Sequence, residues 1–137
     1  MEMDLHDTAL QTAGVIGVGV ALIHGVLTQR YMVTPFTEWA AGEGGLRRSA
    51  RKLVPPLLQF STFNWFVGGL ALIAAPFWSD HDGKLVIGLL VSSSYLYGAL
   101  ANFWSTGGRH PGWLLYAVAL LLIGFGVSDG CRGHGPL

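Results

Sequence analysis

The chain contains few charged residues and a single cysteine. Eight Lys or Arg and eight Asp or Glu account for 12% of its 137 residues, and the formal net charge is zero. A chain without a basic excess lacks the electrostatic footprint of a nucleic-acid-binding protein. Because Cys131 stands alone, an internal disulfide is excluded and the paired spacing of a zinc or redox site is missing. The sequence also has no nucleotide-binding loop and no nucleophile-and-base arrangement, so it offers no catalytic residue.

Apolar residues are abundant and gather in four runs. Hydrophobic side chains make up 51% of the chain, and no Lys, Arg, Asp or Glu interrupts residues 9–27, 57–77, 85–104 and 113–127. A helix needs about 20 apolar residues to cross a hydrocarbon core about 30 Å thick. The pattern therefore predicts an all-α membrane protein, a single domain 1–137 with four transmembrane helices over residues 9–34, 55–77, 85–104 and 112–127.

The cations lie mostly on one side of this predicted membrane domain. Six follow the first and third runs: Arg30, Arg47, Arg48, Arg51, Lys52 and Arg109. Only Lys84 and Arg132 lie on the other side. Loop cations resist translocation, so we expect both termini to be non-cytoplasmic. Short turns at 79–84 and 105–112 make consecutive helices antiparallel. The predicted architecture is an up-down-up-down bundle in a bacterial cytoplasmic membrane.

The predicted cytoplasmic connection, residues 35–54, is basic. Glycines interrupt its centre, and Leu46, Ala50 and Leu53 then share one helical face. Its cations are Arg47, Arg48, Arg51 and Lys52. They act either as a positive-inside anchor or as the basic face of an amphipathic turn on anionic headgroups. The pair 55–56, both proline, predicts the start of the second helix, where missing N–H groups do little harm.

Small residues indicate which helix faces pack together, because lipid tails supply no hydrophobic drive for helix association. In the first helix they recur at every fourth position: Ala9, Ala13, Gly17, Ala21 and Gly25. This small-residue stripe predicts the buried face of the helix. Gly68 in the second helix and Gly98 in the third predict further close approaches between backbones.

Polar residues of the predicted spans fall at the cytoplasmic ends of the helices. The candidates for a ligand site or a hydrogen-bond network are His24, Gln59, Asn64, Asn102, Arg109 and His110. A polar side chain in a membrane is costly unless a partner or water satisfies it, so this grouping predicts a shared inward-facing pocket. His6 and His81 fall in an outer tail and loop, where we expect water to solvate them.

His24 borders the small-residue stripe and is expected to point into the bundle. It is compatible with a proton site, a headgroup site or ligation of a tetrapyrrole metal. It is equally compatible with a structural hydrogen bond between two helices. Bis-histidine haem ligation needs a second imidazole at similar depth, whereas His110 lies in a turn that contains Gly and Pro. We therefore predict no bound cofactor or metal.

Two short motifs resemble a group of small four-helix bacterial membrane proteins of unknown function. Residues 24–30, HGVLTQR, stand where the group has His-x-x-Leu-Gly-Glu-Arg, and residues 109–113, RHPGW, match its Arg-His-x-Gly-Trp turn. The chain departs from the group at Thr28 and Gln29, which replace Gly-Glu, and at Leu58 and Gln59, which replace Trp-His. The resemblance implies a four-helix membrane fold and no particular activity.

Three functions are compatible with these features. The first is a non-catalytic accessory or scaffolding subunit, with membrane lipids and other integral membrane subunits, or a second copy, as partners. Its contact surface would use outward-facing aromatic residues such as Phe63, Phe66, Tyr97 and Tyr116. The second is a carrier or channel for a small solute or lipid. The third is a lipid-modifying enzyme with a histidine base and an arginine clamp, which the lack of an acidic residue in the spans disfavours.

Overall fold

The computed structural model describes residues 4–42 and 47–128, and the regular structure within them is entirely helical. The elements are α1 (Leu5–Thr28), η1 (Gln29–Val33), α2 (Thr34–Gly42), α3 (Arg48–Trp78), α4 (His81–Thr106) and α5 (Gly112–Gly126). Three helices are long and apolar enough to cross a membrane: Leu5–Gly42, Arg48–Trp78 and His81–Thr106. This confirms the predicted all-α class and indicates an integral membrane protein. Leu46, Cys131 and Arg132, for which the sequence made predictions, lie outside the described residues.

The fourth helix, α5, is apolar but shorter than the others. Its 15 residues give a length of about 22 Å, less than the hydrocarbon core of about 30 Å. A helix of this length requires local thinning of the bilayer or access of polar groups to one of its ends.

The first helix continues well past residue 34, where we expected it to end. The widened turn of η1 precedes Pro35, and the N–H of Thr34 donates to the carbonyl of Gln29, five residues back. Pro35 has no N–H and its ring collides with a regular preceding turn, so a π turn at this point lets the helix proceed. As a result α1, η1 and α2 form one helix of 38 residues.

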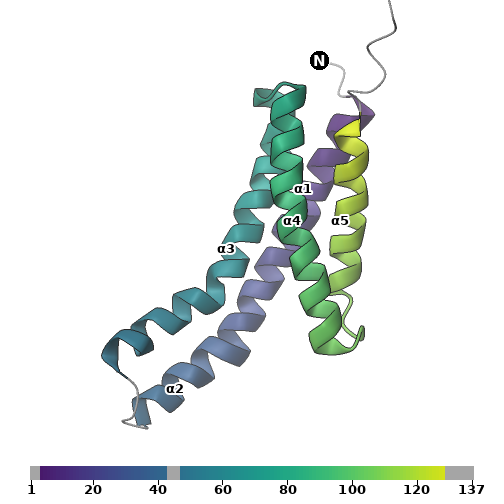
Figure 1. The fold of residues 1–137 in the computed structure, drawn as a ribbon. Coiled ribbons are helices and arrows are strands. Elements are labelled where there is room, and N and C mark those ends of the chain that lie inside the picture. The colour runs from purple at the N-terminus through teal and green to yellow at the C-terminus, as the bar shows by residue number, and fades with distance from the viewer. Residues whose placement is uncertain (1–3, 43–46, 129–137) are drawn as a thin grey trace, which may run out of the picture.

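The second helix begins at Arg48 and not at the proline pair. Pro55 and Pro56 lie two turns inside α3, and Figure 1 shows a bend in the first part of this helix. Each proline removes a donor and presses on the preceding turn, which is the usual cause of a sharp kink. The predicted connection 35–54 is therefore wrong in its bounds, because α2 and the start of α3 make most of it helical.

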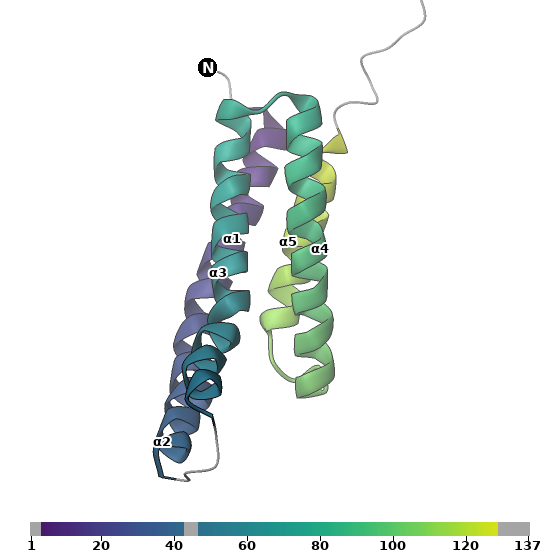
Figure 2. The ribbon, with the colours of Figure 1, turned by 60° about the vertical axis from the view of Figure 1, so that its left-hand side comes forward.

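The helices run alternately in opposite directions (Figure 1). The start of α1, the end of α5 and the corner between α3 and α4 lie together at one end, which we call the acidic end after Asp4, Asp7, Asp80 and Asp82. The opposite or basic end carries Arg30, Arg47, Arg48, Arg51, Lys52 and Arg109. Figure 2 shows two pairs, α1 with α3 and α4 with α5, that diverge toward the basic end.

Fully buried side chains fill the space between the helices. The largest are Leu10, Leu72, Tyr95, Tyr116 and Ile123. Small residues bring α1 close to these neighbours: Ala13 and Ala21 have no exposed surface, Ala9 and Gly17 are buried, and Gly25 is half-buried.

One close approach of α1 and α3 lies at Gly14, which the four-residue stripe does not include. A β-carbon at Gly14 would lie 2.5 Å from the carbonyl oxygen of Gly69, and one at Gly69 would lie 2.7 Å from that of Gly14. Glycine on both helices therefore allows the two backbones to touch.

The turns that reverse the chain have clear local causes. Asp80 begins α4, because its Oδ1 accepts a hydrogen bond from the N–H of Gly83 at 2.9 Å. Gly107 ends α4 in the left-handed conformation, with φ of 57°, where glycine avoids the steric cost of a side chain. These two turns place α5 back against α1 and α4.

Candidate functional site

His24 lies at the centre of a polar contact between α1 and α3. Its Nε2 is 3.2 Å from Oγ of Ser61 and 3.1 Å from Oγ1 of Thr28. Thr28 is buried, and the His24 ring meets Trp65 edge-on with centroids 4.7 Å apart. Two hydroxyl groups thus contact Nε2 and an aromatic ring packs against the imidazole, which fixes the orientation of His24.

Gln59, two residues before Ser61 on α3, extends this contact. Its Nε2 donates to the carbonyl of Gly25 at 3.1 Å and to Oε1 of Gln29 at 3.2 Å. The approach is close, since a β-carbon at Gly25 would lie 2.7 Å from Cγ2 of Thr62. A glycine at position 25 therefore exposes a backbone carbonyl that a side chain on α3 can reach.

Two cavities open beside His24, and both are also lined by Asn102 of α4. We call them together the His24 cleft. One is about 270 Å³ and is further lined by Ser61, Trp65, Tyr97, Ala101 and Ser105. The other is about 210 Å³ and is further lined by Val20, Ile23, Leu27, Thr106, His110 and Gly112. The cleft thus joins residues of α1, α3, α4 and the start of α5, with polar groups on an otherwise apolar wall.

Of the six predicted site residues, the structure brings His24, Asn102 and His110 to this cleft and Gln59 to its border. Asn64 is not among them. Its Nδ2 donates to Oγ of Ser94, in a separate hollow between α3 and α4. Asn64 lies five residues, or about 500° of helical rotation, from Gln59, which turns it to another face.

Arg109 lies outside the cleft. It is exposed in the turn between α4 and α5, where its backbone N–H donates to the backbone carbonyl of Thr106 at 3.2 Å. The neighbouring His110 turns back, and its Nδ1 accepts a hydrogen bond from the N–H of Gly112 at 3.1 Å. His110 and His24 line the same cavity, although the position of His110 in a turn did not predict this.

The predicted packing glycines of α3 and α4 face large side chains. A β-carbon at Gly68 would lie 3.3 Å from Val91, and one at Gly98 would lie 2.7 Å from the Trp65 ring and 3.2 Å from that of Tyr116. Gly98 therefore leaves room for the Trp65 ring, which lines the His24 cleft, and for the Tyr116 ring packed against it.

Aromatic rings continue from His24 into the interior. Trp65 and Tyr116 have centroids 5.0 Å apart, and Tyr116 and Tyr95 are 5.1 Å apart. Tyr116 has no exposed surface and Phe66 is half-buried, so our expectation that they face outward is wrong. Phe63 and Tyr97 are exposed. Within the described residues, the hydroxyl groups of Tyr95 and Tyr116 are buried without a hydrogen-bond partner.

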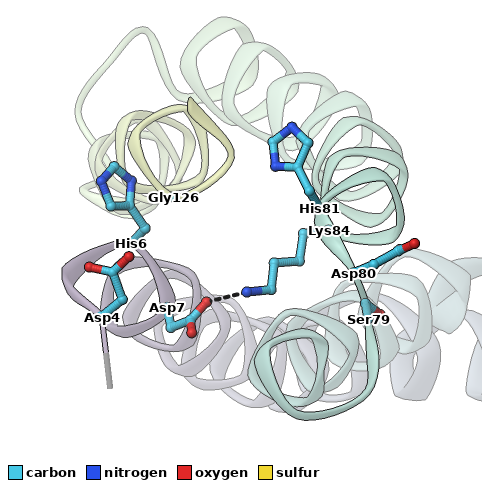
Figure 3. Close-up of a pocket in the computed structure, with 8 residues that line it drawn as sticks. All are labelled: Asp4, His6, Asp7, Ser79, Asp80, His81, Lys84 and Gly126. Carbon is cyan, nitrogen blue, oxygen red and sulfur yellow. Dashed lines mark hydrogen bonds and ion pairs between the residues drawn. The ribbon is translucent and has the colours of Figure 1, made fainter. Parts of the chain in front are cut away.

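A second polar site lies at the acidic end. A cavity of about 410 Å³ is lined by Asp4, His6, Asp7, Ser79, Asp80, His81, Lys84 and Gly126 (Figure 3). Lys84 reaches across it from α4 and pairs with Asp7 of α1, with 2.6 Å between Nζ and Oδ1. Both side chains are mostly buried, at 22% and 23% exposure, so this pair joins the two helix pairs at the acidic end.

His6 belongs to the structured part of this end. It is half-buried, its ring stacks on Phe125 at 4.4 Å, and its Nδ1 lies 2.8 Å from the Phe125 carbonyl oxygen. The expectation that water solvates it is therefore wrong, whereas His81 is exposed. One feature of the sequence could have predicted the ion pair at this end. Asp7 and Lys84 have opposite charges, and each precedes an apolar run on the same predicted side of the membrane.

Metal binding finds no support in the part of the chain that the structure describes, where no group of three or more His, Cys, Asp or Glu side chains could hold a metal ion. The prediction of no cofactor remains untested. No carboxylate lines the His24 cleft, so His24 and His110 have no acidic group there to orient them as bases.

Comparison with known proteins adds no identity to these observations, since no protein-family model, no curated protein and no solved structure matches the chain.

Proposed function

We propose that the protein is a non-catalytic accessory subunit of a larger membrane assembly, with its basic end in the cytoplasm and both termini on the other side. Its contact element is the helical hairpin formed by residues 31–42 and 48–58, which we call the protruding hairpin. The predicted four-helix bundle then holds this hairpin at the surface of a bacterial cytoplasmic membrane.

The length of the first helix supports this proposal. The helix Leu5–Gly42 has 38 residues against 26 in α4, so it extends about 18 Å further from the acidic end. Figure 1 shows α2 extending beyond the level of the turn between α4 and α5, with the start of α3 beside α2. A core about 30 Å thick accommodates α4, and the extra length continues past the hydrocarbon.

The surface of the protruding hairpin carries the proposal. It keeps large apolar side chains more than half exposed: Trp39 and Leu53 lie beyond the predicted spans, and Tyr31, Met32 and Leu57 lie at the ends of the spans. Apolar side chains grouped outside the hydrocarbon are unfavourable unless another surface covers them. Arg47, Arg48, Arg51 and Lys52 lie around them, so a partner with an acidic, partly apolar surface fits best.

A channel has less support. The five largest fully buried side chains fill the space between α1, α3, α4 and α5, so the two polar sites at the ends are separated by a packed apolar and aromatic core. A carrier for a small solute or lipid remains the second candidate, because the His24 cleft offers a polar pocket at the basic end.

Photo-crosslinking in the native membrane tests the accessory function. A photoreactive amino acid at Trp39 or Leu53 is expected to yield one discrete protein adduct of stoichiometric amount. The matched control is Leu89, which is similarly exposed but lies within the apolar run 85–104 of α4 and should react with lipid alone. A protein that purifies alone, and whose residues 39 and 53 react only with lipid, would contradict the proposal.

A further inference from the structure

We infer that the His24 cleft and an adjoining groove on α1 form a binding site for one anionic phospholipid. This inference is independent of the proposed partner contact, because it concerns a different surface of the molecule.

The groove is apolar and lies on one side of α1. Leu22, Ile23, Val26 and Leu27 line a hollow of about 320 Å³. The first three are more than half exposed, so the hollow is open to the membrane. A flexible acyl chain can cover such a strip without the cost of burying a polar group.

The groove is continuous with the smaller cavity of the His24 cleft. Ile23 and Leu27 line both. Beyond these two residues the lining of the cavity becomes polar, because it also includes His24, Asn102, Thr106 and His110. An apolar strip that leads directly into a polar pocket matches a molecule with an acyl chain at one end and a hydrogen-bonding headgroup at the other.

The depth of the pocket agrees with a headgroup. His24 lies 19 residues after Leu5, about 28 Å along the helix, which is close to the full thickness of the hydrocarbon core. The turn at the basic end of the short α5 lies at the same level, and its Arg109 is an exposed cation next to His110. The charge of Arg109 favours an anionic headgroup, and a phosphate there would find the amide of Asn102 and the imidazole groups of the pocket.

The test uses the purified full chain in vesicles of phosphatidylcholine that contain a phosphatidylglycerol with a photoreactive group in its acyl chain. Adducts are located by mass spectrometry. The inference expects them to concentrate on residues 22–27, and it expects Ile23→Trp, which fills the groove, to lower the yield at least fivefold. Val15→Trp is the matched control on the same helix, because Val15 is 61% exposed and Ile23 is 59% exposed. This control should keep the wild-type yield.

The polar part of the site is tested by Arg109→Gln, which removes the nearby cation, and by Asn102→Leu, with circular dichroism to verify that each variant is folded. Each is expected to reduce the preference for phosphatidylglycerol over a photoreactive phosphatidylcholine, and inorganic phosphate should not compete. Adducts spread evenly over the exposed helix faces, or an unchanged yield in folded Ile23→Trp, would overturn the inference. Competition by inorganic phosphate would assign the pocket to a soluble anion and would also overturn it.

Discussion

The hydroxyl group of Tyr95 on α4 fills the space that a side chain at Gly17 of α1 would need, because a β-carbon at Gly17 would overlap the Tyr95 hydroxyl oxygen. Tyr95 has no exposed surface and its ring lies against Tyr116. The ring therefore has no free volume into which it can withdraw. The absence of a side chain at position 17 lets a residue from α4 reach α1 through the middle of the protein.

Gly17→Ala should lower the free energy of unfolding by about 1 to 3 kcal/mol, as overpacking of a filled core usually does. The control is Gly19→Ala in the same helix, where a β-carbon would meet nothing within 4 Å. That substitution should be neutral or stabilise the helix by up to about 1 kcal/mol. Thermal unfolding in detergent measures both, and equal stability of the two variants would show that position 17 is not tightly packed.

The second substitution that tests this contact is Tyr95→Phe. The Tyr95 hydroxyl is buried without a partner among the described residues, and its removal also frees the space beside Gly17. Tyr95→Phe alone should raise the free energy of unfolding by about 1 to 3 kcal/mol, the cost of an unsatisfied buried group. The double variant Gly17→Ala/Tyr95→Phe should have a higher free energy of unfolding than Gly17→Ala alone. A loss of stability in Tyr95→Phe would mean that the hydroxyl is bonded in the membrane.

The Asp7 and Lys84 pair should contribute to holding α4 against α1. Asp7→Asn and Lys84→Gln are each expected to destabilise the protein, and the double variant should lose less than the two single losses added together. We expect a coupling of about 1 kcal/mol, near the upper range for partly exposed pairs, that weakens at high salt. Lys52→Gln at the exposed basic end serves as control. Additive losses in the double variant would argue against a coupled pair.

His24→Ala should lower the free energy of unfolding by about 0.6 to 2 kcal/mol, the range of hydrogen bonds between membrane helices. It removes the contacts with Ser61 and Thr28 and the ring contact with Trp65. His81→Ala, at an exposed position of the acidic end, should have no effect. Should His24→Ala leave stability unchanged while a co-purified ligand is lost, the histidine would serve binding alone.

The membrane orientation is tested by impermeant thiol labelling in a Cys131→Ser background. Cysteine introduced at exposed Ser49 should react only after the cells are permeabilised, because the cations around it keep this end inside. Cysteine at exposed Asp82 should react in intact cells. The reverse pattern would invert the proposed orientation and place the protruding hairpin outside.

The sequence alone determined the all-α class of the protein and the apolar character of its long helices. The four apolar runs and the uneven cations depend only on residue type and order, so they could be interpreted without a structure. The helix ends were less accessible, because Pro35 and the pair 55–56 normally end or begin a helix, whereas here a π turn and a bend keep both helices intact.

Only the tertiary structure decided which way each side chain turns and which distant residues meet. Periodicity identified a small-residue face of α1, but the contact of Gly14 with Gly69 lies just beside it and depends on how the helices cross. Tyr116 points inward, and Asp7 meets Lys84 across 77 positions of sequence. In a membrane every face of a helix is apolar, so hydrophobicity cannot specify its rotation, and packing against the neighbouring helices decides it.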